Sequence, residues 1–257
     1  QCATPVIKRG SNNTFTLECE FPTEGVTIYY TTNETDLTTS SSEYTAPVAT
    51  PFPVTIKAIA VAEGYDNSEV SEKTITESLE LEEDYYLISS SGDFDIFVNM
   101  VNDDGANRNY RVTDDFSVSN PGTITKDFTG TFDGGFHIIS GMSHALFNTI
   151  DGGTVKNVIL KNVSIRTGEN VGGIANTAKG AARIYNCGVL SGSVSGSGAV
   201  GSIVGNLAFQ SSARVVNCYS YADVNGGTYA GGIVGQNNSW NEGVLQGRVA
   251  LCMMYGD

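Results

Sequence analysis

The chain has 257 residues, which suits one large domain or two of ordinary size. Its 14 Lys and Arg residues against 28 Asp and Glu residues give a formal net charge of −14, which argues against a nucleic-acid partner because phosphate binding needs clustered cations. It contains no run of about 18 apolar residues and no signal peptide, so we expect no transmembrane segment and a chain that is either cytoplasmic or already processed.

Composition divides the chain in two. Five of the six prolines lie in its first quarter, whereas 25 of the 30 glycines follow residue 120. Residues 1–84 carry 4 basic and 15 acidic side chains, a net of −11, and residues 85–257 carry 10 and 13, a net of −3. The change falls in a polar acidic stretch, and acidic runs are usually solvated. We therefore predict a first domain over residues 1–78, an acidic linker over 79–84 and a second domain over 85–257.

The first domain is predicted to be a small β-sandwich. Apolar and polar residues alternate over residues 14–20, 26–32 and 54–61, which are rich in β-branched and aromatic side chains, as strands are. Turn-forming residues separate these segments, and short strands at such spacing are typical of a sandwich.

Two cysteines bear on this arrangement. If the chain turns at Gly10-Ser11, residues whose numbers sum to 21 face each other across a hairpin, so Cys2 stands opposite Cys19. The pair is then a candidate cross-strand disulfide, which would place the protein outside the reducing cytosol. The alternative is two buried thiols.

The first domain also contains four motifs in a recognisable order. They are Ile28-Tyr-Tyr-Thr-Thr32, Tyr44-Thr-Ala-Pro47, Thr55-Ile-Lys-Ala-Ile-Ala60 and Gly64-Tyr-Asp-Asn-Ser-Glu-Val70. On these motifs, residues 3–75 resemble the chitobiase/β-hexosaminidase C-terminal-type domain, an immunoglobulin/fibronectin-like accessory module of bacterial extracellular proteins. The resemblance implies a spacer or a binding accessory, because that module is not known as a catalytic unit.

The second domain is a repeat. Val171-Gly-Gly-Ile, Val200-Gly-Ser-Ile and Ala230-Gly-Gly-Ile follow one another at intervals of 29 and 30 residues. A second set of motifs recurs at intervals of 29, 31 and 34 residues, beginning at Val155, Ile184, Val215 and Val249. A period near 30 without a helical pattern predicts a β-solenoid, in which strands of successive coils pair in parallel and like side chains stack about 4.8 Å apart.

Three ladders of side chains are expected inside this stack. They are Val155, Ile184, Val215 and Val249; Ile174, Ile203 and Ile233; and Val158, Cys187, Cys218 and Cys252. Asn157, Asn186 and Asn217 lie at the bend between the first and third ladders, which suits asparagine because it tolerates left-handed geometry. No C-x-x-C pair occurs, so we interpret the stacked cysteines as core filling rather than as a metal or redox site.

The two ends of the stack differ. Residues 91–105 show the apolar face of a helix, made of Phe94, Phe97, Val98 and Val101. Ser91 or Asp93 can cap the start of this helix and Asp103-Asp-Gly105 can end it, so we predict an amphipathic lid on the first coil. At the other end the last repeat begins at Val249, and we expect an incomplete last coil that something unusual covers or that more protein follows.

A second resemblance rests on residues 128–141, Phe-Thr-Gly-Thr-Phe-Asp-Gly-Gly-Phe-His-Ile-Ile-Ser-Gly, on Leu146-Phe147 and on the repeats. With these motifs, residues 85–257 resemble the GLUG-motif family of bacterial surface and secreted proteins, which includes adhesins and non-catalytic parts of some immunoglobulin-A peptidases. The resemblance implies a right-handed parallel β-helix outside the cell. The predicted fold class is therefore all-β: an Ig-like β-sandwich followed by a right-handed parallel β-helix with an N-terminal capping helix.

The sequence shows no convergent catalytic or metal-binding groups. The four acids of residues 152–257 lie at unrelated positions of the period, so we expect no carboxylate pair: Glu169, Asp223, Glu242 and Asp257. His137 and His144 have no neighbouring Ser or Cys with the character of a nucleophile. We expect no catalytic residue, no metal and no cofactor.

Aromatic side chains are the candidate binding residues, because their rings offer apolar platforms with polar tips. In the repeats they are Tyr219, Tyr221, Tyr229, Trp240 and Tyr255, and in the first domain Tyr29, Tyr30 and Tyr44. The alternative is a set of scattered surface tyrosines together with core packing.

The predicted function is that of a non-catalytic, adhesin-like protein on the outer surface of a bacterium. Its rigid β-helix is expected to bind a host or bacterial-surface glycan or protein, and a processed N-terminus would allow membrane tethering. One alternative is a polysaccharide-processing β-helix enzyme, or the non-catalytic N-terminal part of a larger secreted hydrolase or peptidase. Another is a passive spacer without a ligand.

Overall fold

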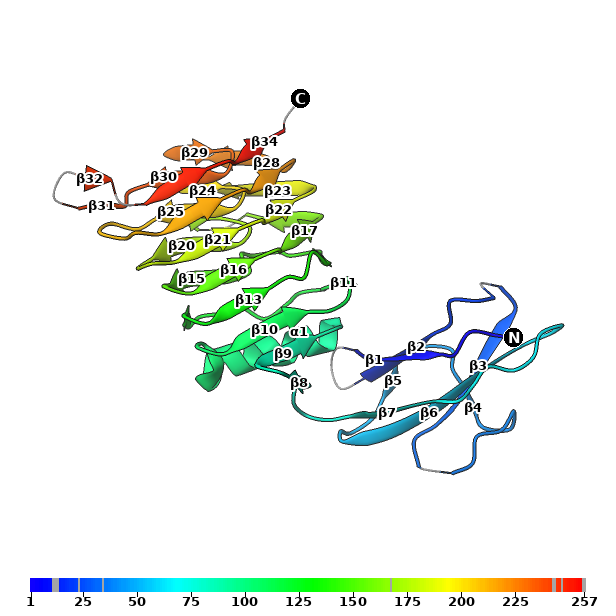
Figure 1. The fold of residues 1–257 in the computed structure, drawn as a ribbon. Coiled ribbons are helices and arrows are strands. Elements are labelled where there is room, and N and C mark those ends of the chain that lie inside the picture. Colours follow the sequence, from blue (N-terminus) through cyan, green and yellow to red (C-terminus); the bar gives the residue numbers. More distant parts are fainter. Residues whose placement is uncertain are drawn as a thin grey trace. The chain divides into compact units, whose positions relative to one another are not determined.

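The computed structural model describes residues 1–257 except 11–13, 23, 34, 167, 242–243, 246 and 256–257, and of residues 240–241 and 244–245 it describes the backbone alone. The described residues form almost only β-strands, with one α-helix and one π-helix, so the fold is all-β as predicted (Figure 1). The chain divides into two compact units. Unit 1 comprises Gln1–Leu79 and Ser90–Asp93, and unit 2 comprises Glu80–Ser89 and Phe94–Asp257.

Unit 1 consists of two antiparallel sheets, with strand orders β1-β2-β5 and β4-β3-β6-β7. The strands are β1 (Val6–Gly10), β2 (Thr14–Glu18), β3 (Val26–Thr31), β4 (Ser42–Glu43), β5 (Val48–Ala49), β6 (Val54–Ala62) and β7 (Ser71–Ile75). Every second residue of β6 is buried from Ile56 to Ala62, as the alternation predicts. Phe15 of β2 and Ile56 of β6 belong to one apolar core, so both sheets contribute to it.

The predicted pairing register between the first two strands is wrong. Gly10 pairs with Thr14 and Ile7 with Leu17, so the numbers of facing residues sum to 24 rather than to 21. Three residues, 11–13, therefore separate the paired positions, where the prediction assumed a tight turn at Gly10-Ser11. A run of turn-forming residues does not by itself fix the length of the connection, and loop length sets the register. In this register Cys2 does not lie opposite Cys19.

Most strands of unit 2 are short and pair in parallel with strands one coil earlier and one coil later, and β8 pairs antiparallel with β9. The eight-stranded sheet contains β8 (Leu81–Glu82), β9 (Tyr85–Ile88), β10 (Asn109–Val112), β13 (Thr131–Asp133), β16 (Thr154–Lys156), β21 (Arg183–Tyr185), β26 (Arg214–Val216) and β33 (Arg248–Ala250). The six-stranded sheet contains β11 (Phe116–Ser117), β14 (Ile138–Ser140), β17 (Ile159–Lys161), β22 (Gly188–Val189), β27 (Tyr219–Ser220) and β34 (Met253–Met254). The five-stranded sheet contains β12 (Asp127–Phe128), β15 (Phe147–Asp151), β20 (Ala175–Lys179), β25 (Val204–Leu207) and β30 (Val234–Asn237).

Three smaller sheets complete unit 2. Two have three parallel strands each: β18 (Val163–Ile165), β23 (Gly192–Gly196) and β28 (Asp223–Gly226), and β19 (Asn170–Val171), β24 (Ala199–Gly201) and β29 (Tyr229–Gly231). The third is the antiparallel pair β31 (Trp240–Asn241) and β32 (Val244–Leu245). Figure 1 shows the coils of unit 2 lying one above another.

The expected side-chain ladders are present. Val155, Ile184, Val215 and Val249 pair in register along the eight-stranded sheet, and the first three are buried. The amide of Ile174 donates to the carbonyl of Ile203, and the amide of Ile203 to that of Ile233, both at 3.0 Å. Residues about 30 positions apart in the sequence therefore lie directly above one another, and their stacked side chains fill the core.

A hydrogen-bonded ladder of polar side chains marks one bend of the coils. Asn157, Asn186 and Asn217 all have positive φ, and each Nδ2 donates to Oδ1 of the residue one coil earlier, beginning at Asp133, at 2.9, 3.1 and 2.9 Å. Leu251 occupies the next position with a φ of 55°, and its side chain is 78% exposed. The ladder ends there because leucine has no amide.

Replacing Leu251 with asparagine is expected to stabilise the chain by about 1 kcal/mol, because left-handed geometry costs an ordinary residue about 1–2 kcal/mol and asparagine much less. The new Nδ2 can also donate to Oδ1 of Asn217, as the earlier members of the ladder do. Urea denaturation gives the free energy of unfolding. Leu251→Ala is the control, because alanine removes the exposed side chain and keeps the backbone penalty. Equal stability of the two variants would contradict the explanation.

Residues 91–105 are helical as predicted: α1 (Ser91–Met100) runs into the π-helix η1 (Val101–Gly105). The cap differs from the predicted Ser91 or Asp93. The amide of Asp93 donates to Ser90 Oγ at 3.2 Å, and Ser90 Oγ donates to Asp93 Oδ2 at 3.0 Å. Three consecutive serines, 89–91, lie at the start of the helix, and the middle one forms this reciprocal pair with a residue three positions later.

The apolar face of the helical segment lies in the core of unit 2. Phe97 is fully buried, and its ring centroid lies 4.7 Å from that of Tyr110, 5.1 Å from Phe132 and 6.1 Å from Phe147. These three rings belong to strands of the first coils, so the helix covers apolar surface that the stack would otherwise expose. None of the described helices is long and apolar enough to cross a membrane.

Candidate functional site

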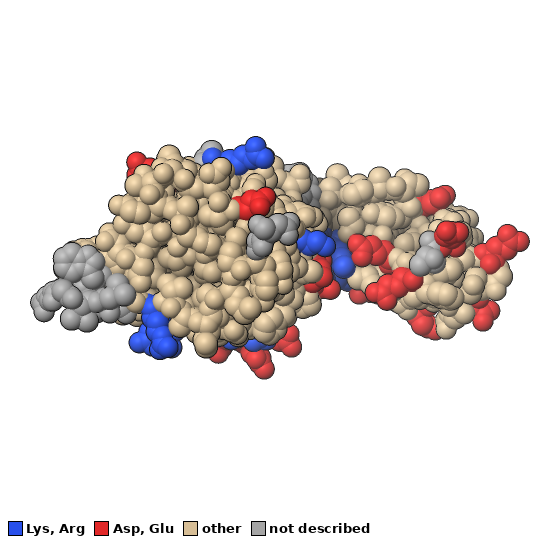
Figure 2. Space-filling model, turned by 90° about the horizontal axis from the view of Figure 1, so that it is seen from above, with Lys and Arg blue, Asp and Glu red and all other residues tan. Residues whose placement is uncertain are grey.

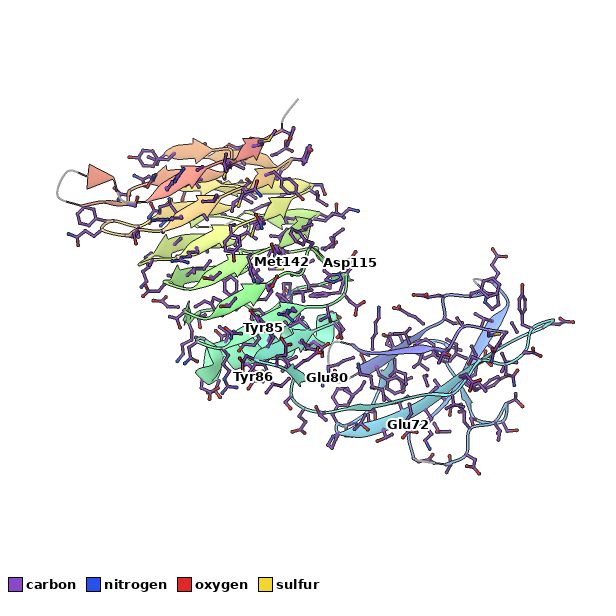
Figure 3. The ribbon with its side chains drawn as sticks, viewed as in Figure 1. Glu72, Glu80, Tyr85, Tyr86, Asp115 and Met142 are labelled. Atoms are coloured by element: carbon purple, nitrogen blue, oxygen red, sulfur yellow. The ribbon has the colours of Figure 1, made fainter. Side chains whose placement is uncertain are left out.

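The described histidines and acids form no cluster that could serve as a metal site. Within the described residues no three His, Cys, Asp or Glu side chains are placed together as metal ligands. His137 Nδ1 lies 3.2 Å from Asp115 Oδ1, which also accepts the amide of Ile138 at 2.9 Å, and Asp115 lies on the connection before β11 (Figure 3). The backbone hydrogen bond from Ile138, with help from His137, lowers the pKa of Asp115. His144 lies apart from this pair, beside the carbonyl oxygens of Ala145 and Pro121.

Asp133 occupies the first position of the asparagine ladder. Its carboxylate accepts hydrogen bonds from Asn157 Nδ2 at 2.9 Å and from the amide of Gly135 at 3.1 Å, and it lies 3.1 Å from Lys156 Nζ. Burial raises the pKa of Asp133, but these three donors together outweigh burial, so the pKa lies below its ordinary value. The carboxylate is therefore a structural anchor for the corner.

Replacing Asp133 with asparagine is expected to cost about 1 kcal/mol at neutral pH, because the charge-assisted contacts weaken. A lowered folded-state pKa means that the stabilisation is complete above pH about 4 and is lost as the pH falls through the folded value. Urea denaturation at pH 7 and below pH 4 measures this, and the variant should lose less stability on acidification than the unaltered chain does. Asp223→Asn is the control, since Asp223 is exposed and has no ion pair among the described residues. If acidification lowers the free energy of unfolding of the unaltered chain and of the Asp133 variant by the same amount, the carboxylate does not stabilise the corner.

The five cysteines are all free in the structure. Cys19 Sγ donates to the carbonyl oxygens of Ala3 at 3.3 Å and Phe21 at 3.2 Å, and Cys2 is buried in the core of unit 1. The hairpin register that placed Cys2 and Cys19 opposite each other is absent, so the geometric reason for a disulfide is lost. Cys187, Cys218 and Cys252 stack as expected, and the hydrogen bond with Cys187, together with burial, raises the pKa of Cys218 to about 12. A thiol with so high a pKa is a poor nucleophile, as core filling predicts.

Tyrosines come together on the outer face of the six-stranded sheet, and we call Tyr219, Tyr221 and Tyr255 the tyrosine cluster. The rings of Tyr221 and Tyr255 stack at 4.4 Å with an interplanar angle of 8°, and those of Tyr219 and Tyr221 meet edge to face at 6.3 Å. Tyr221 is 51% and Tyr255 40% exposed. Two stacked, half-exposed rings form a larger apolar surface than scattered tyrosines would.

The coil geometry positions this cluster. Tyr219 pairs with Gly188 of the coil before and with Met253 of the coil after. A β-carbon at Gly188 would collide with the ring of Tyr219, so the glycine leaves the space in which that ring lies. Tyr255 follows Tyr221 by 34 residues, the spacing that also separates Val215 from Val249, so the two rings stack because the coils do.

The candidate binding residues thus divide into two groups. Tyr219 and Tyr221 lie together, whereas Tyr229 is on β29 of a different sheet. The side chain of Trp240 lies outside the described residues. Tyr255, also one of the predicted aromatic candidates, joins the cluster because its place in the repeat brings it above Tyr221.

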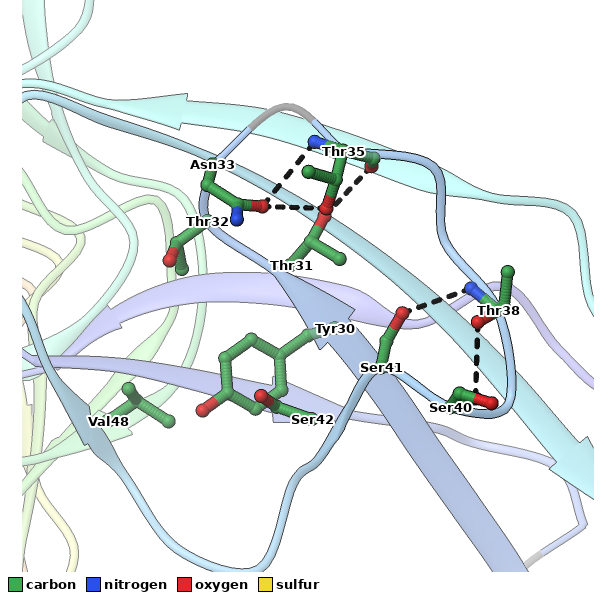
Figure 4. Close-up of a pocket in the computed structure, with 10 residues that line it drawn as sticks. All are labelled: Tyr30, Thr31, Thr32, Asn33, Thr35, Thr38, Ser40, Ser41, Ser42 and Val48. Atoms are coloured by element: carbon green, nitrogen blue, oxygen red, sulfur yellow. Dashed lines mark hydrogen bonds between the residues drawn. The ribbon is translucent and has the colours of Figure 1, made fainter.

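Unit 1 contains a recess of about 380 Å³ beside the connection from β3 to β4 (Figure 4). Tyr30 and Val48 are its apolar lining, and the other eight lining residues are Thr, Ser and Asn. Part of the polar lining bonds within the loop: Thr35 Oγ1 donates to Asn33 Oδ1 at 2.7 Å, and the amide of Thr38 donates to Ser41 Oγ at 3.0 Å. These bonds hold the loop in shape, and none of the described lining residues is charged.

Comparison with known families gives one match for each part of the chain. Residues 8–72 match the chitobiase/beta-hexosaminidase C-terminal domain, which confirms the resemblance of the first part. Residues 115–191 match the M26 IgA1-specific metallo-endopeptidase N-terminal region. The second part is therefore similar to a region of peptidases rather than to GLUG-type adhesins, which corrects the predicted family.

Similar proteins agree with this match. The chain is 36% identical over 123 residues to an immunoglobulin A1 protease of Streptococcus sanguinis, which covers 45% of this chain and 6% of that protein. It is 34% identical over 134 residues to an immunoglobulin A1 protease of Streptococcus pneumoniae, covering 49% and 7%. A crystal structure assigned as an immunoglobulin A1 protease of Bacteroides ovatus has a TM-score of 0.55 and 26% identity, over 66% of this chain and 57% of that one. The chain thus spans a small fraction of the two curated relatives.

Proposed function

We propose that this chain is a non-catalytic part of a larger secreted or surface peptidase related to the M26 metallo-endopeptidases. The observation that carries the proposal is the match of residues 115–191 to the N-terminal region of that family. The small share of each long relative that the chain covers supports it, as does the likeness to the structure from Bacteroides ovatus. Of the functions considered from the sequence, the proposal prefers the non-catalytic part of a larger peptidase to the adhesin.

In this proposal the two units are an immunoglobulin-like accessory module and a right-handed parallel β-helix. Two antiparallel sheets around one core and the family match support the first assignment. Parallel, in-register pairing through successive coils supports the second. Such a stack is stiff because every coil is hydrogen-bonded along its length, so it suits a scaffold that holds other parts of a protein at a fixed separation.

The tyrosine cluster is the contact surface that we assign to this scaffold, with a host or bacterial-surface glycan or protein as its partner. Exposed aromatic rings that lie together are enriched where proteins bind. A glycan array probed with the purified chain tests this assignment against Tyr221→Ala. Loss of signal in the variant supports the assignment, and an unchanged pattern refutes it.

An antibody raised against this chain tests the main proposal in the organism that produces it. We expect the antibody to detect a polypeptide much larger than 257 residues in the culture medium or on the cell surface. Immunoprecipitation should remove a chelator-sensitive endopeptidase activity from the extract. The purified 257-residue chain should cleave no protein substrate under the same conditions. Peptidase activity in the purified chain, or an immunoprecipitate without any, would contradict the proposal.

A further inference from the structure

We propose that a ladder of three arginines on unit 2 binds a linear anionic polysaccharide. Arg183, Arg214 and Arg248 pair with one another on β21, β26 and β33 of the eight-stranded sheet. Ile184 and Val215, which follow the first two, are buried, and Val249 follows the third in the same register, so the arginines project from the outer face, and all three are exposed. Because neighbouring strands lie about 4.8 Å apart, the three side chains follow a straight line along the stack. We call them the arginine ladder.

The arginine ladder has no ionic partner among the residues that the structure describes. Within the described residues none of its three guanidinium groups takes part in a hydrogen bond or an ion pair. The strands β21, β26 and β33 contain no acid, and Asp133, on the outer face of the same sheet, already pairs with Lys156. Like charges on directly neighbouring strands destabilise a sheet. A feature that costs stability, in a chain with a net charge of −14, indicates a role in binding rather than in folding.

The surroundings extend the ladder into a polar track. Thr131 and Thr154 occupy the same register on the two preceding coils, and both residues are partly exposed. Tyr185 lies two residues after Arg183 on the same outer face of β21. Hydroxyl groups, one aromatic ring and a line of cations are the groups that hydrogen-bond sugar hydroxyls, pack against a sugar ring and pair with carboxylate or sulfate.

The chemistry of arginine identifies the ligand as an anion. A guanidinium group binds carboxylate and sulfate through two parallel hydrogen bonds, and several in a row favour a ligand with repeated charges. On the face that Figure 2 shows, acidic side chains are dense over unit 1 and sparse over unit 2. Residues 1–84 carry a net charge of −11 and residues 85–257 one of −3, so an anion meets less repulsion at unit 2. A linear polysaccharide with one acidic group on each sugar provides charges along a line.

Other anionic partners fit this surface less well. An extended peptide turns side chains to the same side about every 6.8 Å, out of step with the ladder. Duplex nucleic acid needs a broader basic surface than three side chains, and electrostatic attachment to a membrane usually takes clusters of about four to eight Lys or Arg. These partners are therefore outcomes that the experiment separates.

Affinity electrophoresis of the full chain tests the proposal with gels that contain polygalacturonate, dextran sulfate or neutral dextran. We expect retardation by the two polyanions, no retardation by neutral dextran, and loss of retardation at high salt because these charges are exposed. The triple variant Arg183→Gln, Arg214→Gln, Arg248→Gln should bind about tenfold more weakly or not at all. Its melting temperature should equal or exceed that of the unaltered chain, since repulsion is relieved.

The control variant is Lys126→Gln, Lys161→Gln, Arg166→Gln, which removes the same charge from exposed positions outside the arginine ladder. It should retain the binding of the unaltered chain. Equal loss in both variants, or no binding to either polyanion, overturns the proposal. Stronger binding to polyglutamate, duplex DNA or anionic-lipid vesicles than to the polysaccharides also overturns it. The readout is binding by this chain alone, so the result is independent of whether the chain is part of a peptidase.

Discussion

Replacing Phe97 with alanine is expected to lower the free energy of unfolding of unit 2 by about 3–5 kcal/mol. The ring is fully buried and lies within 5.1 Å, centroid to centroid, of the rings of Tyr110 and Phe132. Alanine removes the apolar surface, leaves a cavity under the helix, and forfeits the ring pairs, each of which adds about 0.5–1.5 kcal/mol. Because the helix covers the first coils, we expect the amides of the helix to exchange faster in the variant before those of the later coils do.

Phe97→Leu is the matched control, because leucine keeps most of the volume and loses only the aromatic contacts. It should cost no more than about half as much as alanine. Chemical denaturation followed by circular dichroism gives both values, and hydrogen exchange locates the loss. If alanine and leucine destabilise unit 2 equally, cavity formation under the helix is not the cause.

Replacing Gly201 with alanine is expected to cost about 3 kcal/mol, the upper end of what overpacking a tight site costs. A β-carbon there would overlap the carbonyl oxygen of Val204 and would lie 2.6 Å from the carbonyl oxygen of Ile233 and 2.5 Å from the amide of Gly235. All three are backbone atoms, and Ile233 and Gly235 belong to the next coil, so relief requires a shift between coils. Gly172, one coil earlier, has equivalent contacts, which explains why the glycine recurs.

Gly122→Ala is the control for this substitution. A β-carbon at Gly122 would meet Val98 Cγ1 at 3.1 Å, and the end of a side chain can move where backbone cannot. We expect a change within about 0.5 kcal/mol, as for other exposed positions. Thermal melting of the three proteins checks the order. A Gly201 variant as stable as the Gly122 variant would show that the coils separate more easily than their pairing suggests.

The period of the repeats predicted much of unit 2. Because strands of successive coils pair in register, an interval of 29 residues between Val155 and Ile184 is enough to place one above the other. The asparagine bends followed from residue type, since Asn157 and Asn186 both adopt positive φ. The apolar spacing from Phe94 to Val101 likewise predicted the helix.

Local geometry without a period was harder to predict. The pairing register of the first hairpin depends on the length of its connection, which the residue types there leave open. The prediction assumed too short a connection, and for that reason it placed Cys2 opposite Cys19. The cap of α1 depends on which of three serines forms hydrogen bonds with Asp93, and this is set by the backbone geometry of the folded chain.

The candidate surfaces were partly readable from the repeats. Tyr219 and Tyr221 were predicted as exposed aromatics, but the ring of Tyr255 stacks on Tyr221 only because the coils bring distant residues together. The arginine ladder has the same origin, since Arg183, Arg214 and Arg248 precede the three aliphatic residues already aligned in one ladder. A comparison of the residues that precede each member of that aliphatic ladder would have identified the three arginines.

Because the parallel strands of unit 2 pair with equivalent strands of the neighbouring coils, the contacts between one pair of coils resemble those between the next. Deleting one complete period would place Ile184 beside Phe132, an aliphatic residue against an apolar ring, much as Val155 lies beside Phe132 now. The number of coils can therefore change in evolution by whole steps, lengthening or shortening this part of the molecule while the cross-section stays the same.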